Sequence, residues 1–335
     1  MTGTVPANER SREVGPPPPF DPELAAALAV ILQRIPATFT PDLIQVLREG
    51  MAEQRVDDDE FRLGGRYEVT ERLVPGPAGA PDVPLLICLP TGTQAPAGVL
   101  YAAHGGGMII GDHRGPEALE TLGWAAELGL AMVSVDYRLA PENPYPAPVE
   151  DCYAGLEWTV GHTAELNIDP AKVVISGASA GGGLAAATAL LARDRGGPAL
   201  LGQMLLCPML DDRNDTASAH QMTGLGIWDR NSNELGWTAL LGDRRGGPGV
   251  PSYAAPARAT DLSGLPPAFI DVGSAETFRD EAVEYASRIW RAGGQAELHV
   301  WPGGFHGFDG LAAQATLSQA AKAQRVPWLR RLLDR

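Results

Sequence analysis

Short apolar runs recur along most of this chain, and helical patterns separate them from the fourth run onward. The runs span residues 66–74, 83–90, 98–103, 131–136, 172–177, 202–207, 268–273 and 296–301. Strands that alternate with helices are typical of β-α-β crossovers and parallel sheets. The short connection between the first two runs predicts that this pair is antiparallel. We therefore expect an α/β fold with a mostly parallel, twisted sheet of eight strands and helices on both faces.

Two helices are predicted ahead of the first strand. Asp21 is suited to cap the first helix with Pro22 in its first turn, and a second amphipathic stretch begins at Pro41. We expect residues 1–60 to form an N-terminal arm and a helical cap, with the proline-containing residues 1–20 poorly ordered. Residues 61–335 would then form the main α/β domain.

Residues 210–265 interrupt the alternation of strands and helices with many polar and turn-forming residues. A structureless loop of this length is uncommon in a compact domain, so the segment is expected to be functional or to contain short helices. Residues 210–245 could therefore add a further element to the cap or the pocket.

The composition limits the partners that the protein can have. A net charge of −15 over 335 residues repels nucleic acid and anionic lipid. The sequence contains neither a signal-like start nor an apolar stretch long enough to cross a bilayer. We expect a soluble cytoplasmic protein without nucleic-acid or membrane partners. Cys88, Cys152 and Cys207 lack zinc-ligand spacing. Cys88 and Cys207 lie inside apolar runs and are expected to behave as small buried hydrophobes.

The strongest chemical signal is the sequence Gly177-Ala178-Ser179-Ala180-Gly181 between a predicted strand and a predicted helix. A G-x-S-x-G turn at such a junction presents the serine hydroxyl above the sheet edge, at a helix N-terminus that favours negative charge. A glycine-rich surface turn is the simpler alternative. A phosphate-binding loop is disfavoured because the Walker lysine is absent. Ser179 is therefore the candidate nucleophile.

A second signal, His104-Gly105-Gly106-Gly107, directly follows the strand predicted over residues 98–103. Glycines allow a loop to turn its amides toward a ligand, and amide donors stabilise the negative charge of an acyl-transfer intermediate. The simpler alternative is a flexible turn.

The candidate base and acid lie after the last two predicted strands. The six histidines are His104, His113, His162, His220, His299 and His306. His306 follows the last strand in a loop, whereas His299 lies inside that strand and is expected to be structural. An acid must orient the imidazole, and Glu276, Asp280 and Glu281 follow the preceding strand. Glu276 is ranked first because it is nearest to the strand end, and Asp280 is ranked second.

Together these residues resemble the hormone-sensitive lipase family, the bacterial family IV carboxylesterases. The resemblance covers roughly residues 65–335 and is carried, in the family's order, by residues 104–107, 136–151, 177–182, 276–281 and 305–308. It implies the α/β-hydrolase fold, with residues 61–335 as the catalytic domain and the N-terminal helices as a cap over the pocket.

The resemblance also implies an oxyanion hole built from the amides of Gly106, Gly107 and Ala180, with Gly105 shaping the turn. Two positions depart from the family pattern. Ala178 stands where Asp or Thr is usual, and Glu276 stands where Asp is usual. Glutamate can also serve as the acid of this fold.

The predicted function is hydrolysis of small or short-to-medium-chain carboxylic esters by two-step acyl transfer, without a metal or organic cofactor. Hydrolysis of a lactone, an amide or a carbamate is an alternative. Another is a non-catalytic binding protein, because plant gibberellin receptors resemble this family but lack a working triad. The expected partner is a small-molecule ester, and an unpaired edge strand could also support a homodimer.

Several residues near these motifs are expected to support the site. Tyr137, Arg138 and Glu142 are predicted to brace the loop beside residues 104–107, and residues 211–213 to form ion pairs or a solvated turn. The segment around Trp228, Asn231 and Trp237 could line the pocket entrance, but large aromatic residues are more often packed in the core.

Overall fold

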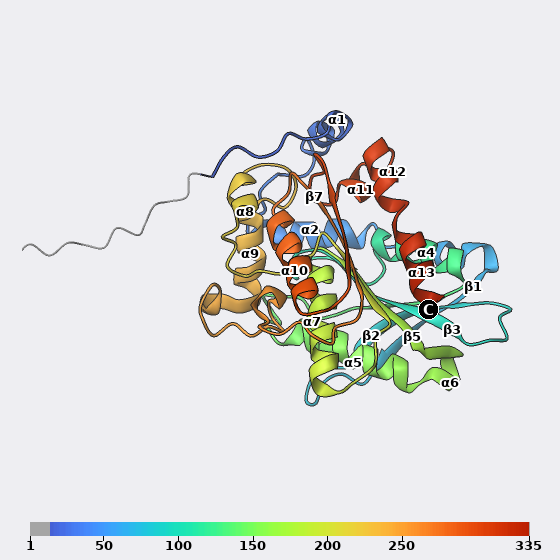
Figure 1. Ribbon diagram of the computed structural model, residues 1–335. Helices are drawn as coiled ribbons and strands as arrows, with labels where there is room; N and C mark the ends of the chain where they lie inside the picture. The colour runs from blue at the N-terminus through green and yellow to red at the C-terminus, as the bar shows by residue number, and fades with distance from the viewer. Residues whose placement is uncertain (1–13, 335) are drawn as a thin grey trace, which may run out of the picture.

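The structure, a computed structural model, describes residues 14–334 and contains one eight-stranded sheet (Figure 1). The strand order is β1-β2-β4-β3-β5-β6-β7-β8. The strands are β1 Tyr67–Val74, β2 Val83–Pro90, β3 Ala97–Ala103, β4 Ala131–Val135, β5 Ile168–Ala178, β6 Gly202–Leu206, β7 Ala268–Gly273 and β8 Ala296–Trp301. Strand β2 pairs antiparallel with β1 and β4, and the remaining pairs are parallel. The predicted sheet is confirmed, including its antiparallel first pair.

Thirteen α-helices and three short 3₁₀ helices surround the sheet within residues 14–334. The α-helices are α1 Pro22–Ile31, α2 Leu43–Ala52, α3 Asp58–Phe61, α4 Pro116–Leu128, α5 Ala147–Gly161, α6 Thr163–Leu166, α7 Ala180–Arg195, α8 Ala217–Gln221, α9 Arg230–Leu241, α10 Arg279–Arg291, α11 Phe308–Leu311, α12 Thr316–Lys322 and α13 Arg325–Leu333. The 3₁₀ helices are η1 Leu63–Gly65, η2 Gly242–Arg244 and η3 Pro256–Arg258. No helix in this part of the chain is both long and apolar enough to cross a membrane.

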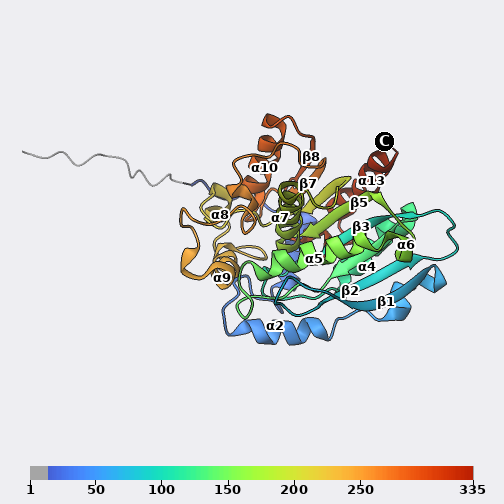
Figure 2. The same ribbon diagram turned by 90° about the horizontal axis from the view of Figure 1, so that it is seen from below.

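Helices cover both faces of the sheet, and each face has its own hydrophobic core (Figures 1 and 2). Helices α5, α7 and α10 contribute to one core, and α4 and α13 contribute to the other. Strand β3 serves both, because Val99 and Tyr101 belong to the first core and Leu100 to the second. All seven residues of β3 are buried, which explains why its sequence is continuously apolar.

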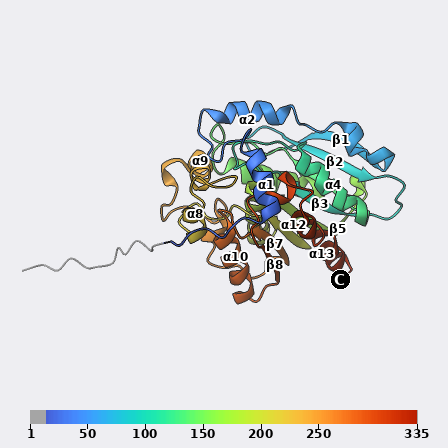
Figure 3. The same cartoon turned by 90° about the horizontal axis from the view of Figure 1, so that it is seen from above.

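The N-terminal helices lie against the rim of the α/β layers. Asp21 caps α1 by accepting hydrogen bonds from the amides of Glu23 and Leu24, as its position before Pro22 predicts. Figure 3 shows α1 beside α12, where Leu24 and Leu28 pack with Phe305 and Phe308. Of the predicted arm, residues 1–13 lie outside the described residues. Residues 14–20 form no helix or strand, and Gln221 of α8 donates to the carbonyls of Gly15 and Pro16.

The helices of three regions extend the sequence analysis. Helix α4 was not predicted, although Pro116 occupies its first turn and Gly129 ends it with a left-handed backbone. The C-terminal segment forms two helices, α12 and α13, and Pro327 lies in the first turn of α13. The polar segment 210–265 contains α8, α9 and two 3₁₀ helices, so it is not structureless.

A buried ion cluster attaches α13 to the sheet. The guanidinium of Arg325, whose side chain is 2% exposed, lies 3.2 Å from Asp271 of β7 and 3.4 Å from Glu120 of α4. It also binds Asp309 of α11 and lies over the ring of Trp124. Burial raises the pKa of Asp271 even though Arg325 opposes this shift. The arginine therefore compensates the charge of buried Asp271 and of two carboxylates that are only partly exposed.

Replacing Arg325 with methionine is expected to lower the free energy of unfolding by about 3–5 kcal/mol, because the buried carboxylates lose their counter-ion. Urea denaturation measures this change. The matched control is Arg331→Met in the same helix, which removes an exposed pair with Glu297 and should cost at most about 1 kcal/mol. Equal losses in the two variants would contradict the structural role assigned to Arg325.

Candidate active site

Ser179 lies in a tight turn between β5 and α7. Its backbone is strained, with φ of 57° and ψ of −120°. A Cβ on Gly177 would lie 2.3 Å from the carbonyl of Gly181, and one on Gly181 would lie 2.0 Å from the carbonyl oxygen of Ala103. Only glycine fits at these two positions, so the G-x-S-x-G pattern follows from the close approach of this turn to β3.

Ser179, His306 and Glu276 are joined by consecutive hydrogen bonds. The Nε2 atom of His306 is 2.9 Å from Ser179 Oγ, and Nδ1 is 3.0 Å from Glu276 Oε1. The other carboxylate oxygen of Glu276 accepts a hydrogen bond from the amide of Gly273 at the end of β7. Ser179 is 8% exposed, His306 7% and Glu276 1%. The arrangement can move a proton from the serine to the imidazole while the carboxylate holds the ring.

The other two candidate acids are used elsewhere. Asp280 accepts a hydrogen bond from the amide of Ser218 and forms an ion pair with Arg279. Glu281 accepts from the amides of Leu210 and Asp211, in the segment that follows β6. Of the three acids considered from the sequence, Glu276 is therefore the one that contacts His306.

The remaining histidines have structural contacts away from the serine hydroxyl. His104 stacks on Tyr137, and its ring nitrogen Nδ1 lies 2.7 Å from the carbonyl oxygen of Gly105. Burial lowers the pKa of His104, so the neutral imidazole is favoured and Nδ1–H donates this bond. His299 stacks on Trp301, as expected for a histidine inside a strand. The others pair with nearby residues: His113 with Asp136, His162 with Trp158, and His220 with Asp215.

The loop of residues 104–107 begins where β3 ends, beside Ser179. Gly105 donates its amide proton to the carboxylate of Glu117, a residue in the first turn of α4, over 2.8 Å. The amides of Gly106, Gly107 and Ala180 have no hydrogen-bond acceptor within residues 14–334. These three donors are free to bind a developing oxyanion, whereas the Gly105 amide is already engaged.

An aromatic layer packs over this loop. A Cβ on Gly107 would lie 1.9 Å from the ring of Trp228, which explains the need for glycine there. Trp228 is 4% exposed and meets Phe39 of the N-terminal segment edge to face, with ring centroids 5.5 Å apart. Thr277, next to Glu276, donates to the Trp228 carbonyl. Phe39 of the N-terminal segment and Trp228 of the segment 210–245 thus contact each other next to the glycine loop.

Of the predicted bracing residues, Tyr137 contacts the loop of residues 104–107, whereas Arg138 and Glu142 hold the segment beside it. Tyr137 donates its hydroxyl proton to the His104 carbonyl, and Arg138 forms a bidentate pair with Asp151. Glu142 pairs with Arg48 of α2, which also donates to backbone carbonyls of this region. Arg48 was not identified from the sequence because it lies far from the motifs.

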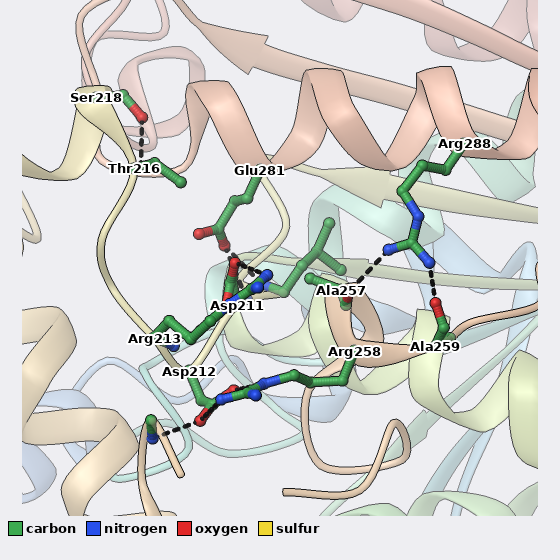
Figure 4. Close-up of polar contacts among 12 residues, drawn as sticks. Asp211, Asp212, Arg213, Thr216, Ser218, Ala257, Arg258, Ala259, Glu281 and Arg288 are labelled. Atoms are coloured by element: carbon green, nitrogen blue, oxygen red, sulfur yellow. Dashed lines mark hydrogen bonds and ion pairs between the residues drawn. The ribbon is translucent and has the colours of Figure 1, made fainter. Parts of the chain in front are cut away.

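The acidic residues 211 and 212 form ion pairs rather than a solvated turn (Figure 4). Asp211 pairs with Arg213 at 2.6 Å, and Asp212 with Arg258 at 2.7 Å. Glu281 reaches this segment from α10, and its pKa is raised well above the usual value by burial and by Asp211. The cluster fixes the chain that leaves β6 toward α8 and α9.

Comparisons with known proteins identify the family. The model of the family described as alpha/beta hydrolase fold matches residues 99–310. The chain is 33% identical to carboxylesterase NlhH of Mycobacterium tuberculosis, over 93% of this chain and 97% of that protein. The chain belongs to the hormone-sensitive lipase family of α/β-hydrolases.

Solved structures agree with this assignment. A bacterial heroin esterase superposes with a TM-score of 0.86 at 38% identity, covering 94% of this chain and 98% of that one. Esterase LipW from Mycobacterium marinum superposes with a TM-score of 0.83 at 34% identity, covering 96% and 99%. This member of the family is a serine carboxylic ester hydrolase, and its expected substrate class, a small-molecule ester, is confirmed.

Glu117 provides a test of how the glycine loop of this esterase is held. Glu117→Ala removes the acceptor of the Gly105 amide, so the neighbouring free amides lose their fixed position and kcat is expected to fall about tenfold to a hundredfold. Glu117→Gln keeps an acceptor oxygen and should retain most of kcat. The measurement is steady-state ester hydrolysis, with thermal unfolding to verify the fold. Equal kcat in both variants and the wild type would contradict this role.

Proposed function

We propose that Ser179 is the nucleophile, His306 the general base and Glu276 the acid of a two-step acyl transfer. The observation that carries this proposal is the pair of hydrogen bonds, 2.9 and 3.0 Å long, from Ser179 through both nitrogens of one imidazole to Glu276. Glu276 accepts from Nδ1–H, so Nε2 is free to take the serine proton. His306 then gives that proton to the leaving alcohol, and water releases the acid in the second step.

The amides of Gly106, Gly107 and Ala180 form the oxyanion hole in this proposal, while Gly105 shapes the turn. Two observations support this role. The three amides donate to no other acceptor in the described chain, and they lie beside the turn that carries Ser179. Each such donor is worth about 3–4 kcal/mol of transition-state stabilisation. Because the donors are fixed before the substrate arrives, they pay no reorganisation cost when charge develops.

Residues 1–60 act as an arm and cap, residues 61–335 as the catalytic domain, and residues 210–245 as a second part of the cap. This division is supported by two aromatic contacts: Phe39 with Trp228, and Phe20 with Phe305, whose ring centroids are 6.4 Å apart. Both contacts join the N-terminal segment to residues beside the triad. The nearly complete burial of Ser179 favours small or short-to-medium acyl chains.

The related alternatives are less well supported. Lactones, amides and carbamates suit the same triad chemistry, but the curated relatives LipI and LipN of Mycobacterium tuberculosis are named as an esterase and a carboxylic ester hydrolase. A non-catalytic binding role is disfavoured because Ser179, His306 and Glu276 are all present and are joined by hydrogen bonds. The cytoplasmic location and the homodimer remain predictions; the buried free thiols Cys88, Cys152 and Cys207 are consistent with a reducing compartment.

The triad assignment is tested with p-nitrophenyl esters of increasing acyl length. Ser179→Ala removes the nucleophile and is expected to lower kcat by about 10⁴-fold or more. Glu276→Gln is expected to lower kcat by about 10³- to 10⁴-fold, because the carboxylate no longer holds the imidazole in the required tautomer and orientation. Asp280→Asn should leave kcat near that of the wild type. If Asp280→Asn abolishes turnover while Glu276→Gln does not, Asp280 is the acid and the assignment is wrong.

Trp228 is predicted to limit the acyl chain. Trp228→Ala should raise kcat/KM for longer acyl chains relative to acetate, because removing the ring opens space above Gly107. Trp290→Ala is the matched control, since that side chain lies exposed on α10. A chain-length profile identical to that of the wild type would show that Trp228 does not bound the pocket.

A further inference from the structure

The thiol of Cys207 lies next to the catalytic set. Cys207 directly follows β6, and its amide donates to the carbonyl of Asp271 over 2.7 Å. Its Sγ, a carboxylate oxygen of Glu276 and a ring nitrogen of His306 all lie within 4.8 Å of one another. No other group of three or more His, Cys, Asp or Glu side chains in residues 14–334 brings its donor atoms this close together.

The three donor types match a zinc site. Zinc binds sulfur, imidazole nitrogen and carboxylate oxygen in a tetrahedron, and its bond lengths place such donors about 3.4–3.6 Å apart. Nδ1 of His306 and Oε1 of Glu276 are 3.0 Å apart, so small side-chain shifts would make room for an ion. Three protein donors leave a fourth position for water.

The surrounding charge favours a cation. Burial raises the pKa of the Cys207 thiol, and the negative charges of Glu276, Asp309 and Asp271 raise it further. A bound cation would offset this concentration of negative charge. Arg325 pairs with Asp271 and Asp309 but not with Glu276. The carboxylate nearest to His306 is therefore left without an arginine or lysine partner within the described chain.

We propose that Cys207, Glu276 and His306 form an inhibitory site for a thiophilic divalent cation such as Zn²⁺. This inference rests on the proposed catalytic roles of His306 and Glu276. On binding, the thiol loses its proton to solvent and the metal takes a lone pair of the imidazole. If that nitrogen is Nδ1, the ring proton moves to Nε2 through solvent, so the hydrogen bond to Glu276 is lost and Nε2 can no longer accept the proton of Ser179. If it is Nε2, the nitrogen cannot accept the proton of Ser179. Turnover stops in either case.

The first test measures hydrolysis of p-nitrophenyl acetate at buffered concentrations of free Zn²⁺. We expect reversible inhibition that EDTA relieves. Cys207→Ser, or Cys207→Ala as a second variant, should raise the Zn²⁺ concentration for half inhibition about tenfold or more, with each protein compared with its own metal-free rate. Cys152→Ser, a buried free thiol in α5, is the matched control and should respond like the wild type. Equal inhibition of the wild type and both Cys207 variants, or no inhibition, would overturn the proposal.

A binding measurement separates this inference from the catalytic assignment. Co²⁺ added to the wild type and to Ser179→Ala should produce a thiolate-to-cobalt absorption band in the near ultraviolet, which Cys207→Ser lacks. This readout needs no turnover. A cobalt band without zinc inhibition would count against the catalytic roles of His306 and Glu276. The absence of a band that depends on Cys207 would overturn the metal site itself.

Discussion

The geometry of the site depends on how closely the turn after β5 approaches the end of β3. The carbonyl oxygen of Ala103 lies 2.0 Å from where a Cβ of Gly181 would be, so no side chain can stand between the two segments. This contact brings Ser179 next to the glycine loop that follows β3. The strained backbone of Ser179 is held from both sides, because its amide donates to Leu206 and its carbonyl accepts from Met209.

Carboxylates bound to backbone amides hold the loops around this contact. Glu117 accepts from Gly105, Glu281 from the chain after β6, and Glu276 from Gly273. Loops at the carboxyl end of a parallel sheet leave many amides without ladder partners, and a carboxylate can satisfy these donors. Part of the acidic excess of the chain therefore has a structural purpose beyond keeping the surface negative.

The sequence was most informative where a local pattern determines a local structure. The eight apolar runs predicted the eight strands, and the glycines around Ser179 predicted its turn. Glu276 and Asp280 could only be ranked, because both follow β7 and their orientations depend on how α10 packs. Glu117 was missed together with helix α4. The proximity of Cys207 to His306 could not be predicted, because it depends on β6 lying between β5 and β7 in the sheet.

The packing of α1 links the N-terminal helices to the loop that carries His306. Leu24 and Leu28 pack with Phe305, the residue just before His306, and Glu23 accepts a hydrogen bond from the amide of Thr316 at the start of α12. Phe305 therefore belongs to the hydrophobic contacts of α1 as much as to the loop that carries His306. A displacement of α1 would remove packing from the residue that precedes this imidazole. Shortening the N-terminal segment would accordingly expose Phe305 and loosen the loop that holds His306 in place.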